Sequence, residues 1–177
     1  MVFFNTFDCK MKIIKFLSLL LFLNIFYCCS VYNFTGSSKI SAKTFQVNFF
    51  RNNAPIIEPG IDVKFTRRLQ DLIQNQTNLS LTSSNGDLLY EGEIIDFYVS
   101  PMSATANQRA NQNRLTISVN LKFTNKKKEA DSFEKKFSFF HDFPANEQLT
   151  GRTLATALEV IFERITQDIF NDTLAKW

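Results

Sequence analysis

Few side chains of this 177-residue chain have the types and spacing that a catalytic site requires. His141 is the only histidine, and it stands at the end of a predicted strand. A nucleophilic triad would need a serine or cysteine placed against it, but the sequence has no G-x-S-x-G motif and its three cysteines all lie within the first 29 residues. We therefore expect His141 to be a surface residue and the protein not to be an enzyme.

Two carboxylates, Glu91 and Glu93, are two residues apart and would share one face of a strand. Such a pair can act in acid–base catalysis or bind a cation. No histidine or aspartate cluster stands beside it, and the five glycines form no phosphate-binding loop. We interpret the pair as part of a solvated strand face, and we expect neither a metal nor a cofactor.

A stronger signal lies near the N-terminus. Lys12 and Lys15 precede an apolar run from Phe16 to Tyr27, which ends at Cys28-Cys29-Ser30. A basic stretch followed by a short apolar run is typical of a secretory signal peptide, and the run is too short for a permanent membrane span. A cysteine directly after such a run is typical of bacterial lipoproteins. We predict lipidation of Cys29, with Cys28 and an uncleaved N-terminal anchor as the alternatives.

These features divide the chain into three predicted parts. Residues 1–28 are a signal peptide, and we interpret residues 1–10 as the product of a start codon assigned too far upstream. Residues 29–40 are a lipidated tether, and residues 41–177 form a single globular domain. No cysteine follows Cys29, so disulfides and cysteine-ligated metals are excluded and the fold must rest on its apolar core.

The charge of the mature part is nearly balanced. Removing Lys10, Lys12, Lys15 and Asp8 with the signal peptide leaves 17 basic and 16 acidic residues, a net charge of +1. This balance does not indicate a general polyanion-binding surface, and we expect no nucleic-acid partner.

The spacing of apolar residues predicts the order β-α-β-β-β-β-α. Strands are expected at 44–50, 79–82, 88–99, 114–124 and 132–141, and helices at 59–76 and, capped by Thr150, at 150–174. One β-α-β crossover makes the first strand parallel to a neighbour, and hairpins make the rest antiparallel. The predicted fold is α+β, a two-layer sandwich with a mixed, mostly antiparallel sheet of about four or five strands and two helices packed on one face.

Details of three strands sharpen this prediction. Asn85-Gly86 predicts a type I′ hairpin turn before the strand 88–99. Apolar residues change face midway along that strand, which predicts a bulge or a twist near Gly92. The strand 114–124 alternates most clearly, and the lysines of the strand 132–141 suit an exposed edge.

The segment 100–113 differs from its surroundings. It is small, polar and without periodicity, and it joins two well-defined strands. A loop of this length is usually functional or disordered. A plain hairpin loop and a partner-binding loop are equally compatible with the sequence.

Four stretches of the chain resemble a known family. They are C-S-V-Y-N-F-T-G-S-S after the signal, F-F-R-N-N-A-P, S-L-T-S-S-N-G-D-L-L-Y-E-G-E-I, and N-R-L-T-I-S-V-N-L-K-F-T-N-K-K. They resemble the LptE family of lipopolysaccharide-assembly lipoproteins in the form found in Bacteroidetes, from Cys29 to Trp177. The resemblance implies a sheet backed by two helices, and an outer-membrane lipoprotein in the lumen of the barrel LptD that assists barrel assembly and lipopolysaccharide delivery.

The resemblance gives the remaining candidate residues their expected roles. The predicted loop would contact the barrel through Pro101, Met102, Arg109 and Asn113. Bases expected together at one end of the sheet would contact lipopolysaccharide phosphates: Arg109, Arg114, Lys122, Lys126, Lys127 and Lys128. One alternative is a lipoprotein scaffold or pilot subunit of another cell-envelope complex. A periplasmic enzyme is another, and it would need a cleft with perturbed titratable groups around His141 or Glu93.

Overall fold

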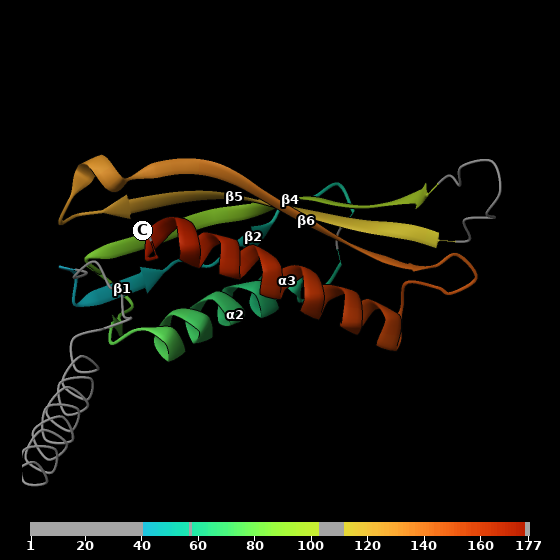
Figure 1. Cartoon of the computed structure of the whole chain (residues 1–177), viewed down its shortest axis with the longest axis horizontal. Helices are drawn as coiled ribbons and strands as arrows, with labels where there is room; N and C mark the ends of the chain where they lie inside the picture. Colours follow the sequence, from blue (N-terminus) through green and yellow to red (C-terminus); the bar gives the residue numbers. More distant parts are fainter. Residues whose placement is uncertain (1–40, 57, 103–111, 176–177) are drawn as a thin grey trace, which may run out of the picture. The chain divides into compact units, whose positions relative to one another are not determined.

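The computed structural model describes residues 41–56, 58–102 and 112–175. Within them, a mixed six-stranded sheet carries two helices on one face (Figure 1). The elements are β1 (Thr44–Val47), β2 (Arg51–Asn52), α2 (Ile61–Gln76), β3 (Ser80–Leu81), β4 (Leu88–Met102), β5 (Gln112–Asn125), the 3₁₀ turn η2 (Glu129–Asp131), β6 (Phe133–Pro144) and α3 (Gly151–Thr173). The predicted α+β fold is confirmed. Cys29 and Arg109 lie outside the described residues.

The predicted strand 44–50 ends early, at Val47, and a second short strand, β2, follows outside the predicted range at Arg51–Asn52, which accounts for the extra strand in the sheet. β1 and β2 both pair with β4 in parallel, and the chain between them leaves the ladder. At this interruption Phe50 turns fully into the core, where its ring meets that of Phe65 edge-on at 5.1 Å. The backbone N–H of Phe50 donates to Thr66 Oγ1 of α2 (3.1 Å), so the interruption is tied to the helix layer.

Gly92 of β4 makes room for this inward turn. A Cβ atom at this position would lie 2.2 Å from the carbonyl oxygen of Asn120 on β5 and 2.6 Å from the Phe50 ring. The bulge expected near Gly92 lies two residues further on, where β4 pairs Ile94 with Val119 but Asp96 with Ser118. The extra residue, Ile95, shifts the buried positions of β4 from even to odd numbers, as the change of face predicted.

The predicted hairpin at Asn85-Gly86 is wrong. β1 lies between β3 and β4 and is parallel to both, so residues 82–87 cross the end of β1 instead of joining paired strands. Asn85 has a positive φ of 54°, but Gly86 does not, which excludes a type I′ turn. Gly86 is needed for close approach, because a Cβ there would lie 2.7 Å from Gln46 Cβ. Asp87 then accepts hydrogen bonds from the backbone N–H groups of Lys43 (2.8 Å) and Thr44.

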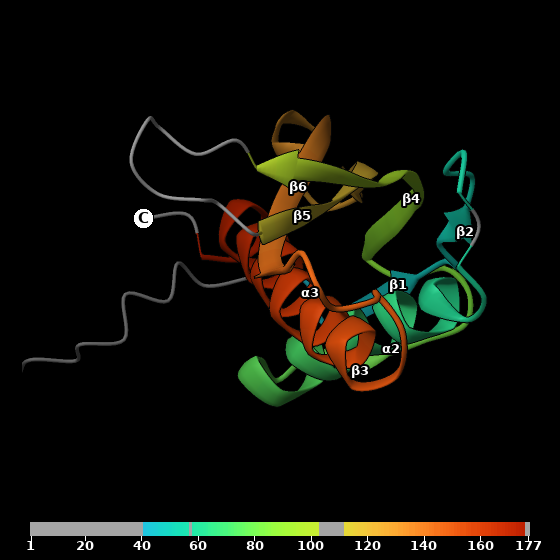
Figure 2. The same cartoon turned by 90° about the vertical axis from the view of Figure 1, so that its right-hand side faces the viewer.

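The two helices form the second layer and close the core. Figure 2 shows both on the same side of the strands, with β2 at the right-hand margin. The predicted stripe of α2 is buried at Ile61, Phe65, Leu69 and Ile73. The rings of Phe65 and Phe162 meet at 5.3 Å and join α2 to α3.

Thr150 precedes α3 as predicted, but its side chain makes no capping hydrogen bond. Thr153, in the first turn, instead donates to Glu147 Oε2 (2.8 Å) and ties the helix to the preceding turn. No helix in the described part of the chain is long and apolar enough to cross a membrane.

Candidate partner-binding surface

The outer half of β4 has only one neighbouring strand. β2 ends where Asn52 pairs with Ile94, and from Asp96 to Met102 the ladder of β4 continues with β5 alone. One edge of this part of β4 is therefore unpaired among the described strands. We call β4 from Asp96 to Met102, with the facing part of β5 from Gln112 to Ser118, the outer hairpin. Its strands extend past the first turn of α3 at the right of Figure 1.

Apolar side chains are exposed on both faces of the outer hairpin. Tyr98 and Val99 are 47% and 42% exposed, although successive strand residues point to opposite faces. Tyr98 pairs with Thr116, which in turn pairs with Phe140 of β6, 40% exposed on the same face. The sequence analysis did not single out these three residues. The strand register shows that Tyr98 and Phe140 lie on the sheet face away from the helices, whereas Val99 is exposed on the helix-facing side.

The predicted loop is shorter than 100–113. Pro101 pairs with Asn113 and Met102 with Gln112, so these candidates lie in the strands of the outer hairpin. Backbone pairing extends the ladder even though the side chains show no apolar alternation. Pro101 suits an edge strand, because it has no N–H to leave unpaired.

Arg114 lies on the outer hairpin, but it is engaged by an acid. Its Nε and Nη2 donate to the two carboxylate oxygens of Asp142 at 2.7 and 2.9 Å, and its guanidinium lies 3.5 Å from the centre of the Phe140 ring. The Arg114 hydrogen bonds lower the pKa of Asp142 and raise that of Arg114. A phosphate would therefore compete with Asp142 for this cation.

The predicted grouping of bases at one end of the sheet is wrong. Arg114 is near the start of β5, whereas Lys126, Lys127 and Lys128 follow its end at Asn125. Twelve residues of extended chain separate Arg114 from Lys126, a span of about 40 Å. Lys122 lies between them and is exposed.

The lysine turn is partly neutralised at its own end of the sheet. Lys127 Nζ lies 3.0 Å from Asp87 Oδ1, and Lys128 Nζ lies 3.0 Å from Asp131 Oδ1. The backbone N–H of Lys43 and then Lys127 stabilise the charged carboxylate of Asp87, which lowers its pKa from 3.8 to about 2. Lys126 has no ion pair among the described residues.

The residues considered for catalysis are not brought together. Glu91 accepts a hydrogen bond from Asn48 (2.9 Å) and Glu93 one from Asn53, so each carboxylate has its own partner. His141 is half-buried on β6 and makes no side-chain hydrogen bond within the described part. The described residues also contain no group of three or more histidine, cysteine or acidic side chains able to hold a metal.

The sheet face away from the helices is polar and cross-linked. Asn120 donates to Glu134 (2.8 Å), Lys136 to Asp96 (2.7 Å), and the hydroxyls of Ser118 and Ser138 are 3.0 Å apart. Such a face can lie against another polar surface without leaving buried groups unpaired.

Comparisons with known proteins agree with the fold. The LptE family model, described as lipopolysaccharide-assembly, matches residues 42–173. No curated protein sequence matches the chain significantly. A hypothetical protein of Chlamydia trachomatis has a similar structure, with a TM-score of 0.52, 9% identity, and coverage of 77% of this chain and 100% of that one. This likeness shows the fold alone.

Two lipoprotein structures are also similar. The minor lipoprotein of Acinetobacter baumannii gives a TM-score of 0.48 with 7% identity, covering 72% of this chain and 89% of that one. The rare lipoprotein B of Shewanella oneidensis gives a TM-score of 0.43 with 12% identity and the same coverages. The family match covers 132 of the 177 residues and supports an LptE-like role in lipopolysaccharide assembly. The chain belongs to the LptE family.

Proposed function

We propose that the protein is an outer-membrane lipoprotein, anchored through lipidated Cys29, whose domain occupies the lumen of an LptD-type β-barrel. In this role it assists assembly of the barrel and takes part in transport of lipopolysaccharide to the cell surface. The exposed apolar part of the outer hairpin is the structural observation that carries the proposal.

The outer hairpin has the composition of a protein interface. Tyr98 is exposed on the face that carries the paired Arg114 and Asp142, next to Phe140 of the adjoining β6, and Val99 is exposed on the opposite face. Aromatic residues and arginine are enriched at interfaces, where a few central side chains supply most of the binding energy. Burying the exposed half of an aromatic or aliphatic side chain contributes about 1 kcal/mol.

The polar sheet face favours a barrel as the partner. The lumen of an outer-membrane barrel is polar, so a domain inside it needs polar sides and a rigid core more than an extended apolar surface. The hydrogen bonds across this face, from Asn48 just after β1 to Glu134 and Lys136 on β6, supply such a side, and the outer hairpin supplies a small apolar contact at one end.

The proposed anchor allows this position. Residues 30–43 number 14 and can span at most about 50 Å between Cys29 and β1. A lipoprotein that carries more than one acyl chain is stably held at a membrane surface. The domain could therefore enter a barrel while its lipid stays in the inner leaflet.

Contact with lipopolysaccharide phosphates is assigned to bases without an acidic partner. Lys122 and Lys126 fit this condition among the described residues, whereas Arg114, Lys127 and Lys128 are each paired. Arg109, which lies outside the described residues, stays a candidate for the same role.

Affinity purification from detergent-solubilised outer membranes tests the proposal. We expect the tagged protein to recover a large β-barrel in stoichiometric amount, and the Cys29→Ala variant to retain it if docking is separable from anchoring. Tyr98→Ser combined with Val99→Ser should reduce recovery of the barrel. The matched control is Val160→Ser, a residue 38% exposed on α3 of the helix layer and not on the outer hairpin.

Three outcomes would count against the proposal. Recovery of the lipoprotein alone would remove the barrel as partner. Recovery with a different envelope complex would favour the scaffold or pilot-subunit alternative. Equal losses in the double variant and in Val160→Ser would show that the outer hairpin is not the contact.

A further inference from the structure

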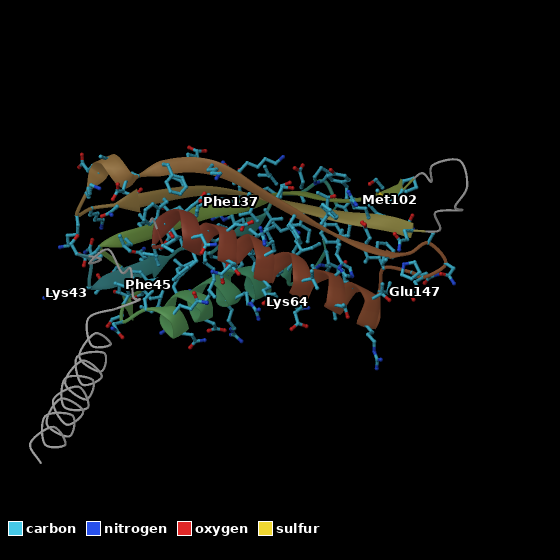
Figure 3. The ribbon with its side chains drawn as sticks, in the orientation of Figure 1. Lys43, Phe45, Lys64, Met102, Phe137 and Glu147 are labelled. Atoms are coloured by element: carbon cyan, nitrogen blue, oxygen red, sulfur yellow. The ribbon has the colours of Figure 1, made fainter. Side chains whose placement is uncertain are left out.

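One side of β4 is open in the outer hairpin. β2 lies beside β4 only as far as Ile94, whose carbonyl oxygen accepts a hydrogen bond from the backbone N–H of Asn53 (2.9 Å). Beyond this point no described segment hydrogen-bonds to the backbone of β4 on that side. Figure 3 shows Met102 at the outer end of β4, whereas Lys43, just before β1, lies at the opposite end of the sheet. We call the unpaired side of β4 in the outer hairpin the open edge.

The bulge determines which backbone groups face the open edge. The N–H and C=O groups of successive strand residues point to alternate sides, and the extra residue Ile95 shifts this alternation by one. Beyond the bulge, even-numbered residues therefore face β5, and Phe97, Val99 and Pro101 face the open edge. Pro101 suits this position, because a residue that faces β5 needs an N–H for the ladder. The open edge thus presents the N–H groups of Phe97 and Val99 and the carbonyl groups of all three residues.

The outer edges of the sheet are protected against the addition of a strand. β3 forms one of them and is only two residues long. β6 forms the other, and Lys135 and Lys136 lie on its two faces, where they pair with acids of α3 and β4 at 2.6 and 2.7 Å. Short strands and charged side chains, lysine above all, are the usual means of protecting a sheet edge.

Two rings cover the next part of the β6 edge. Phe139 and Phe140 are consecutive and so point to opposite faces of the sheet, yet their rings stack with centroids 5.5 Å apart and 19° between planes. Since β5 lies on the other side of β6, the rings meet over its free edge. Arg164 and Arg114 lie over these two rings, at 5.6 and 3.5 Å from their centres. Among the described residues no such stack covers the open edge of β4, and residues 97–101 carry no charge.

The open edge is complementary to itself. It runs from Asp96 to Met102, and Val99 is its midpoint. When two such edges pair in antiparallel about this midpoint, the Val99 N–H of each copy donates to the Val99 carbonyl of the other. The Phe97 N–H donates to the Pro101 carbonyl of the other copy. Every N–H group of the open edge is then used, and the N–H that Pro101 lacks is not needed as a donor.

Other antiparallel centres are less suitable. A centre at Tyr98 would place Met102 of one copy opposite Ile94 of the other, where β2 already lies. A centre at Ser100 would place the Phe97 N–H opposite a residue beyond the end of β4. The free length of the edge therefore selects the pairing about Val99.

We propose that the protein forms a dimer in which the open edges of two copies pair in antiparallel about Val99, so that the two sheets become one. Val99 then faces Val99 of the other copy, and Tyr98 faces Ser100 on the polar face, with no like charges opposed. One short strand pair is a smaller contact than the roughly 1,200–2,000 Å² of stable complexes, so the dimer is weak and exchanges. Val99 also belongs to the surface proposed for the barrel, so dimer formation and barrel docking exclude each other, but the dimer does not depend on the barrel.

Disulfide trapping tests the proposal on the full-length protein in detergent, without any barrel. Val99→Cys should accumulate as a covalent dimer, because residues opposite each other in a hydrogen-bonded antiparallel pair have Cα atoms about 5.5 Å apart. Val160→Cys on α3 is the matched control for random collision, since the two valines are 42% and 38% exposed. Mass spectrometry of the linked peptide distinguishes this link from links through the native cysteines at positions 9, 28 and 29.

Two further substitutions test the register and the backbone pairing. Tyr98→Cys and Ser100→Cys proteins should link when mixed, whereas Tyr98→Cys alone should link poorly, because its two copies are diagonal neighbours about 7–8 Å apart. Adding Val99→Pro to both proteins should lower their link about tenfold, since both central hydrogen bonds are lost. The Val99 N–H faces the open edge, so the melting temperature should stay unchanged.

Three results would overturn the proposal. Linking at residue 99 that does not exceed linking at residue 160 would exclude the dimer and leave the open edge to a strand of another protein. Equal linking of Tyr98→Cys to itself and to Ser100→Cys would exclude the register. A link insensitive to Val99→Pro would exclude backbone pairing. If Val99→Pro lowers the melting temperature, Val99→Lys replaces it, because it opposes two like charges at the centre of the pair without changing the backbone.

Discussion

The two halves of β4 belong to one continuous strand but have different surroundings. The inner half, from Leu88 to Ile94, lies between β1 or β2 on one edge and β5 on the other. Its buried Tyr90 donates a hydrogen bond to Thr173 of α3 (3.2 Å), and burial raises the pKa of this phenol. The outer half, from Asp96 to Met102, has β5 alone as its neighbour, and Tyr98 and Val99 are exposed there.

The difference shows that the face on which a side chain lies, which changes at the bulge, and the neighbours on that face together decide its burial. Both halves contain tyrosine and aliphatic residues, and both pair regularly with β5. Two flanking strands and two helices make the inner half part of the core, whereas a single flanking strand leaves the outer half open. We therefore expect inner-half substitutions to change stability and outer-half substitutions to change partner binding.

The largest effect is expected at the phenylalanine that fixes β1 and β2 against the inner half. Phe50→Ala should lower the free energy of unfolding by about 4 kcal/mol, because it empties a fully buried site against Phe65. Phe49→Ala is the matched control, since this ring is 52% exposed, and it should change stability by less than about 0.5 kcal/mol. Urea unfolding followed by circular dichroism measures both. Equal losses of unfolding free energy in Phe50→Ala and Phe49→Ala would show that Phe50 does not fix β1 and β2 against the inner half.

Gly92 should give the second largest effect. Gly92→Ala places a methyl group against the Asn120 carbonyl, a backbone atom that cannot move away alone, and should cost about 2 kcal/mol. Ser100→Ala in the outer half should cost less than about 0.5 kcal/mol. The same urea titration measures both. An unchanged free energy of unfolding in Gly92→Ala would contradict the close packing of the inner half.

Asp87 should give a smaller and pH-dependent effect where the inner half begins. Its pKa of about 2 in the folded protein is below the ordinary 3.8, so its contribution to stability is complete above pH 4 and is lost as the pH falls toward 2. Asp87→Asn should lower the urea midpoint at pH 7, and the difference from the wild type should shrink as the pH falls from 4 toward 2 and vanish only below pH 2. Asp131→Asn, which affects only the contact with Lys128, should change the midpoint less. A pH-independent difference would contradict the role of the charge.

The smallest effect on stability is expected in the outer half. Tyr98→Ser should change the free energy of unfolding by less than about 0.5 kcal/mol, because the side chain is already half exposed. Its effect on recovery of a barrel partner should nevertheless exceed that of Phe49→Ala. A large loss of stability in Tyr98→Ser would show that the outer half is part of the core.

Local patterns in the sequence predict much of this fold. The alternation of β5 correctly places Leu115, Ile117, Val119, Leu121 and Phe123 in the core, and the apolar stripe of α2 is correct. The change of face along β4 also indicates its bulge within two residues. These features depend on neighbours within one element, which is why spacing alone reveals them.

Features set by distant pairing could not be predicted in the same way. Asn85-Gly86 is a local turn signal, but the strands that pair with Leu88 are β1, more than 40 residues earlier, and β5, further along the chain. Arg114 meets Asp142 because of the register between β5 and β6, which the sequence does not display. The separation of Arg114 from Lys126–Lys128 follows from strand length alone, since an extended strand as long as β5 must separate its ends by tens of ångströms.

The position of β1 between β3 and β4 determines how the domain resists mechanical force. A pull on the chain ahead of Lys43 enters the sheet along β1, which is hydrogen-bonded to parallel strands on both sides. Such a load shears both ladders at once and cannot peel the strand from an edge one bond at a time. Asp87, which holds the N–H groups of Lys43 and Thr44, is the first contact to bear the load.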